Sequence, residues 1–148
     1  MADTWDTDRL IADGFEYAVV EHEWCDGPRA GLAPVEGVPH YFRCLRRDDG
    51  DEPGTYQVWP ASAGAALWER EWWAIFAVWN ARQEAGDDTP HPDLGGVDVR
   101  YDALGRLLVP HRRCPAGARQ LIGELRFDDG ERYRADGTDY WFRWRPVR

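Results

Sequence analysis

A single long helical pattern with strand-like patterns on both sides of it is the feature that most limits how this chain can fold. In residues 62–86 the large apolar side chains recur at helical spacing, Ser62 is placed as an N-cap, and Gly86 is placed to end the helix. The stripe predicted to face the core consists of Ala65, Trp68, Trp72, Ile75, Phe76 and Trp79.

The flanking segments have the alternation and the turn residues of antiparallel strands. The predicted strands are residues 15–24, 38–47, 55–60, 121–127, 131–135 and 138–147, with a further hairpin in 97–110. Residues 1–12 are predicted to form a short helix or a loosely attached arm. We therefore predict one α+β domain, 1–148, with antiparallel strands before and after one long Trp-rich helix packed across the sheet.

The charge and composition of the chain limit which kinds of partner it can bind and where in the cell we expect it. The chain carries 27 Asp and Glu against 18 Arg and no Lys, a formal net charge of −9. This charge repels phosphates, so we expect no nucleic acid as a partner, whereas a basic protein is compatible with it. No apolar run is long enough for a membrane span, and the acidic N-terminus does not resemble a signal peptide. We expect a cytoplasmic protein with free thiols, no membrane contact and no cofactor.

Residues 22–44, HEWCDGPRAGLAPVEGVPHYFRC, contain His and Cys at a spacing that is also found in zinc sites. Four side chains could supply the nitrogen and sulfur ligands of one ion, namely His22, Cys25, His40 and Cys44. On regular strands, however, residues 22 and 25 point to opposite faces, and residues 40 and 44 lie about 13 Å apart. We therefore interpret the stretch as two strands joined by a Gly/Pro-rich loop without a metal, and a zinc-stabilised domain is the less favoured alternative.

Two short segments resemble patterns in other proteins. Residues 26–42 contain D-G-P-R-x-G-x-A-x-x-x-G-x-P-H-x-F, which is similar to a pattern in small uncharacterised bacterial proteins. No activity is attached to that pattern, so the resemblance implies only a recurrent structural unit. Residues 101–108, YDALGRLL, resemble one unit of the YD repeat of large Rhs-type bacterial proteins. The repeat forms a hairpin in that family, so the resemblance implies a hairpin here and nothing about function.

The Gly/Pro-rich loop holds the candidate catalytic residues. Arg29 and His40 could present a cation and an imidazole beside Asp26, with His22 nearby, and such a set could bind an anion or a carboxylate or transfer protons. The alternative is structural, because an Arg29–Asp26 ion pair could simply hold the loop while His40 lies in solvent. We favour the structural alternative.

Trp73 is the tryptophan that the predicted core explains least well. On a helical projection it lies off the predicted stripe, beside Glu69 and Asn80. An exposed tryptophan next to acidic groups is typical of a protein interface, although a second packing layer could bury it. Trp73 and Arg29 are therefore our candidate binding residues.

The sequence favours a protein-binding module over an enzyme. Its size, negative charge and aromatic content are those of small acidic proteins that bind a basic partner, such as the immunity proteins that block basic toxins. That comparison is one of type and not of sequence. The alternative is a small enzyme or ligand-binding protein that uses Asp26, Arg29 and His40.

Overall fold

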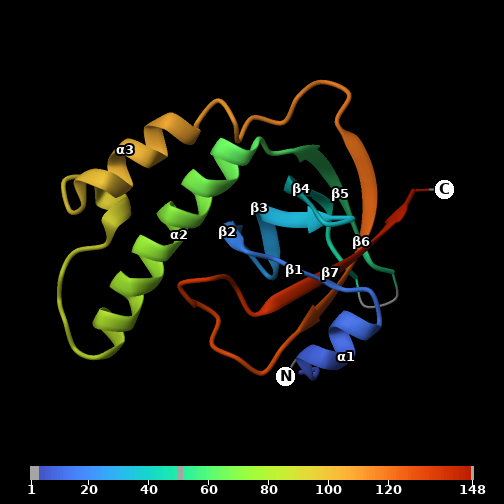
Figure 1. Ribbon diagram of the computed structural model, residues 1–148, viewed down its shortest axis with the longest axis horizontal. Helices are drawn as coiled ribbons and strands as arrows, with labels where there is room; N and C mark the ends of the chain where they lie inside the picture. The colour runs from blue at the N-terminus through green and yellow to red at the C-terminus, as the bar shows by residue number, and fades with distance from the viewer. Residues whose placement is uncertain (1–3, 50–51, 148) are drawn as a thin grey trace.

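The structure is a computed structural model that describes residues 4–49 and 52–147 (Figure 1). Its elements in chain order are α1 (Thr7–Ala12), β1 (Glu16–Tyr17), β2 (Val20–Trp24), β3 (Pro28–Val35), β4 (Val38–Arg46), β5 (Gly54–Pro60), α2 (Ala63–Glu84), the 3-10 turn η1 (Pro92–Leu94), α3 (Val99–Leu108), β6 (Arg119–Phe127) and β7 (Tyr140–Pro146). The prediction of a mixed α+β fold with antiparallel strands is confirmed.

The seven strands form one antiparallel sheet that curls round on itself. Their order is β1-β7-β6-β5-β4-β3-β2, so β1 and β2 occupy the two edges. These two strands are parts of one stretch of chain, separated by only two residues. The amide of Ala18 donates to the Tyr140 carbonyl at 3.1 Å, whereas the next amide, Val19, donates to Leu32 on β3 at 3.0 Å. The bend at these residues therefore connects the two edge strands of the sheet.

Aromatic side chains fill the concave side of the sheet. Phe42, Tyr56, Phe142 and Trp144 contact one another there with ring centroids 4.5–6.4 Å apart. Gly123 makes room for them, because a Cβ at this position would lie 2.9 Å from the Trp144 ring and 3.0 Å from the Tyr56 ring. The absence of a side chain at Gly123 therefore lets the aromatic rings pack on the concave side of the curved sheet.

The helix α2 packs against the convex side of the sheet at β2, α3 packs against α2, and α1 lies on the opposite side of the molecule (Figure 1). The N-cap prediction is confirmed, since Ser62 Oγ accepts a hydrogen bond from the Ala65 amide at 3.1 Å. The buried face of α2 is rotated from the predicted stripe and consists of Ala65, Ala66, Glu69, Trp72, Trp73 and Ala77. Tyr101, Leu104 and Leu108 of α3 complete this part of the core.

Three predicted segments differ from the structure. The segment predicted as a Gly/Pro-rich loop contains the strand β3, which pairs with both neighbours because Gly31 leaves space for the Val20 carbonyl of β2 and the Phe42 ring of β4. The hairpin predicted around residues 103–105 is wrong, because residues 99–108 form α3, with Asp98 as its N-cap. Residues 131–135 belong to a loop and not to a strand, and Arg134 pairs there with Gly137 in an isolated bridge.

Candidate functional site

The predicted loop residues are not brought together into one site. Asp26 pairs with Arg47 at 3.0 Å and not with Arg29, which donates from Nε to the Cys25 carbonyl at 3.3 Å. His40 Nδ1 lies 2.8 Å from the Val38 carbonyl. No hydrogen bond or ion pair joins Asp26, Arg29 and His40 in the described part of the chain. The predicted Asp26–Arg29 pair is therefore wrong.

The four residues considered as zinc ligands also separate in the structure. His22 on β2 hydrogen-bonds to Glu69, Cys25 is exposed, and Cys44 on β4 is a free thiol. His40 lies near the start of β4, and β3 separates β4 from β2. Within residues 4–49 and 52–147, no three His, Cys, Asp or Glu side chains lie close enough to hold a metal ion.

A buried ionic cluster lies where α2 crosses β2. Glu69 is completely buried. Its Oε1 lies 2.9 Å from His22 Nε2, and Arg112 donates to both of its carboxylate oxygens, at 2.7 and 3.0 Å. The Arg112 guanidinium also lies 4.5 Å from the centre of the Trp72 ring. The cluster thus ties β2, α2 and the segment after α3 together.

The surroundings keep Glu69 ionised and His22 neutral. Burial alone would raise the pKa of Glu69, but hydrogen bonds from His22 and Arg112 outweigh it and lower that pKa to about 2. Burial lowers the pKa of His22, although the hydrogen bond to Glu69 acts in the opposite direction. The Glu69 carboxylate is closed to solvent, whereas Arg112 lines an open pocket together with Trp72 and Tyr101. We therefore interpret the cluster as a structural clamp whose central carboxylate is buried.

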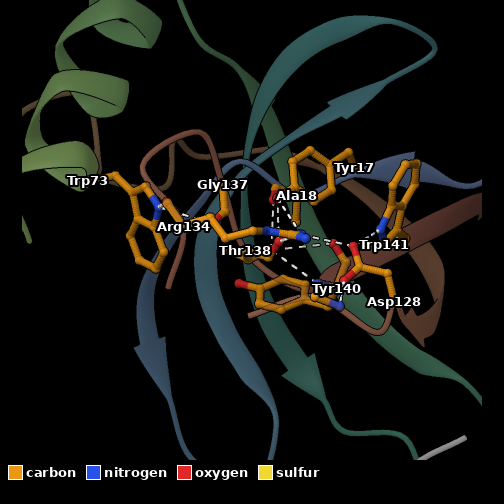
Figure 2. A network of polar contacts seen from close by, with 10 residues as sticks. Tyr17, Ala18, Trp73, Asp128, Arg134, Gly137, Thr138, Tyr140 and Trp141 are labelled. Atoms are coloured by element: carbon orange, nitrogen blue, oxygen red, sulfur yellow. Dashed lines mark hydrogen bonds and ion pairs between the residues drawn. The ribbon is translucent and has the colours of Figure 1, made fainter. Parts of the chain in front are cut away.

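Trp73, a candidate binding residue, belongs to the core and not to the surface. Its side chain is 1% exposed, and its indole N–H points to the carbonyls of Arg134 and Gly137, at 2.6 and 3.2 Å (Figure 2). The second packing layer allowed by the sequence is therefore what the structure contains. Trp73 cannot act as an exposed anchor for a partner.

The loop that receives Trp73 is held by a second polar network. Asp128 accepts hydrogen bonds from Arg134 and from the Trp141 indole, both at 2.9 Å (Figure 2). Arg134 also donates to the hydroxyl of Tyr17 at 2.6 Å. Burial raises the pKa of Tyr17 to about 12, so this hydroxyl is neutral at pH 7. The network fixes residues 128–141 between β1 and α2.

An open groove lies between α2 and residues 87–98. It has a volume of about 430 Å³, and its lining includes Glu71, Ile75, Val78, Trp79, Asp87 and Val97. From Glu71 through Ile75 and Val78 to Arg82 the lining positions follow one face of the helix. The groove therefore runs along α2 and combines apolar side chains with three acidic ones and with Arg82.

The surface around this groove is both apolar and acidic. Several large apolar side chains on α2, α3 and the segments beside them are exposed, namely Leu67, Val78, Leu94, Val99, Leu107 and Val109. Residues 84–98 carry five Asp and Glu and no Arg. This combination was not predicted, because the candidate binding residues were Trp73 and Arg29. The acidic segment that follows α2 was the feature of the sequence that could have indicated this surface.

Comparisons with known proteins give no further assignment. No protein-family model, curated protein or solved structure matches this chain. The resemblances of residues 26–42 and 101–108 to bacterial patterns therefore receive no support from a relative. Among the described residues, no helix is both long enough and apolar enough to cross a membrane.

Proposed function

We propose that this chain is a protein-binding module that recognises a basic partner through the groove between α2 and residues 87–98. The observation that carries the proposal is that an apolar groove lies next to residues 84–98, a segment with five acidic residues and no Arg. Apolar contacts at the centre of such a surface would supply affinity, and the acidic border would select a basic partner.

Contacts around Trp79 support a groove that exists before the partner binds. The Trp79 indole N–H donates to the Thr89 carbonyl at 2.9 Å, and its ring lies 4.4 Å from the His91 ring. Asp87 accepts hydrogen bonds from both the amide and the hydroxyl of Thr89. A preformed surface loses less conformational entropy on binding than a flexible one.

The overall charge supports the same class of partner. A net charge of −9 attracts a basic protein over a longer range than the contacts themselves. Immunity proteins that block basic toxins in the cytoplasm are the type of protein that this proposal resembles, and here the proposed contact surface is the helical side. An enzymatic role for Asp26, Arg29 and His40 has less support, because the three side chains do not share a pocket.

Paired substitutions test whether the groove itself selects the partner. In affinity purification from host cells, Val78→Asp is expected to remove the bound protein because it places a charge in the groove. Ile11→Asp is the matched control, since Ile11 is 59% exposed but lies in α1, away from the groove. Loss of the same protein from both variants, or from neither, would contradict the proposal.

A second pair separates the local charge from the total charge. Asp88→Arg and Asp8→Arg change the net charge equally, but Asp88 lies beside the groove and Asp8 lies in α1. We expect Asp88→Arg to weaken binding by at least about tenfold and Asp8→Arg to weaken it much less. Equal weakening by the two substitutions would show that only the total charge matters.

A further inference from the structure

A second pocket lies at the end of the sheet where β4 begins, β5 ends and β6 begins. Its volume is about 350 Å³, and the side chains that matter to its chemistry are His40, Trp59, Pro60, Pro115, Ala116 and Arg119. It is separate from the groove along α2, with which it shares no lining residue. Its size is that of a site for a small molecule.

The polar side chains of this pocket carry no negative charge. Arg119 and His40 line it, and no Asp or Glu does, although the chain has a net charge of −9. Elsewhere Arg112, Arg132 and Arg134 each pair with a buried carboxylate. In the described part of the chain, Arg119 has no such acidic partner. A guanidinium in this position is available to an anion from outside.

His40 has one ring nitrogen engaged and one available. Its Nδ1 lies 2.8 Å from the Val38 carbonyl, which fixes the orientation of the ring. Nε2 is then the nitrogen that can face a ligand. Arg119 and His40 come from β6 and β4, which lie on either side of β5, so they approach the pocket from two directions.

The remaining walls are apolar and held by backbone contacts. The Trp59 indole N–H donates to the His111 carbonyl at 3.1 Å, so its ring is fixed. The Ala61 amide donates to the Pro39 carbonyl at 3.0 Å, and the Ala118 amide donates to the Pro115 carbonyl at 3.3 Å. Gly117, with φ of 75°, allows the tight turn of residues 115–118. The pocket therefore has fixed apolar walls and one cationic side.

We propose that this pocket binds an organic carboxylate with a compact apolar body. The Arg119 guanidinium holds the carboxylate by two parallel N–H···O bonds, and the His40 ring forms part of the wall beside it. The apolar body lies against Trp59, Pro60 and Pro115. The carboxylate belongs either to a free small molecule or to the C-terminus of a peptide. This site does not depend on the proposed partner of the groove.

An NMR titration with phenylacetate and its neutral isostere phenylacetamide tests the proposal. The indole N–H signal of Trp59 is assigned as the one that is missing from the Trp59→Phe variant. Phenylacetate is expected to shift this signal with saturation, at a dissociation constant on the order of millimolar. Phenylacetamide is expected to bind at least about tenfold more weakly because it lacks the charge.

Two variants of exposed arginines complete the experiment. Arg119→Gln is expected to remove the saturable shift, whereas Arg43→Gln, on the exposed part of β4, is expected to leave it unchanged. Absence of a saturable shift, equal binding of the two probes, or equal weakening by the two variants would overturn the proposal.

The source of the carboxylate is decided with the tripeptide Gly-Gly-Phe and its C-terminal amide. Tighter binding of the free acid peptide than of phenylacetate would identify a peptide C-terminus as the ligand. Tighter binding of phenylacetate would identify a free small molecule. Both results support the carboxylate site, whereas equal binding of the acid and amide peptides, together with equal binding of phenylacetate and phenylacetamide, would contradict it.

Discussion

Replacing Glu69 by Ala is expected to lower the free energy of unfolding by about 3–5 kcal/mol. The carboxylate is completely buried, and its removal leaves Arg112 and His22 without the acceptor that both of them contact. It also breaks the connection between β2, α2 and the segment after α3. Urea denaturation followed by tryptophan fluorescence measures the change.

Glu71→Ala is the matched control for this prediction. Glu71 lies two residues further along the same helix and pairs with Arg100, but both side chains are about half exposed. We expect a loss of less than about 1 kcal/mol, because water replaces an exposed ion pair at little cost. Similar losses for the two variants would contradict the interpretation of Glu69 as a buried clamp.

The pH dependence of the same unfolding transition gives a second measure of the cluster. Folding lowers the pKa of His22 from 6.5 and that of Glu69 from 4.5 to about 2. The unfolded chain therefore binds more protons than the folded one as pH falls, and protonation favours unfolding. Stability should decrease below about pH 6.5 through His22, and further between about pH 4.5 and 2 through Glu69. In His22→Gln the decrease between pH 7 and 5 should be smaller than in the wild type.

Replacing Trp73 by Ala is expected to lower the free energy of unfolding by about 3–5 kcal/mol. The side chain is the largest of those that are fully buried, and it contacts Phe76 and Tyr133 with ring centroids 5.6 and 5.9 Å away. The substitution leaves a large cavity and two carbonyls without their indole donor. Thermal or urea unfolding measures the effect.

Leu67→Ala provides the comparison for Trp73. Leu67 lies on the same helix but is 69% exposed, so its truncation should change stability by no more than about 0.5 kcal/mol. If Trp73→Ala were as mild as Leu67→Ala and instead reduced binding of the partner, Trp73 would be a surface anchor after all. The core position described above would then be wrong.

The sequence predicted the elements whose signals are local. The helix α2 has a side-chain N-cap at Ser62, and β2, β4 and β7 lie within predicted strands, while β5 begins one residue before its predicted start. For α3 the helical spacing of Tyr101, Leu104 and Leu108, with Asp98 as N-cap, was present in the sequence. The resemblance of this segment to a hairpin repeat and the turn preference of Gly105 outweighed that spacing in the prediction.

The Glu69 cluster, the burial of Trp73 and the groove were harder to predict, because each depends on contacts between distant parts of the chain. His22 and Arg112 are 47 and 43 residues from Glu69, and no local pattern shows that they converge on it. The rotation of α2 that buries Trp73 depends on the loop at Arg134, 61 residues away. The groove is likewise formed by the way residues 87–98 fold back on α2.

Site-specific photocrosslinking tests the central claim, that a basic partner binds in the groove along α2. p-Benzoylphenylalanine is placed at position 78 in the groove or at position 11 in α1, where Ile11 is similarly apolar and 59% exposed. The proposal predicts an adduct with one basic protein in host cells from position 78 and none from position 11. In lysates this adduct should decrease as salt increases, because charge attracts the partner. No adduct from position 78, or the same adducts from both positions, would contradict it.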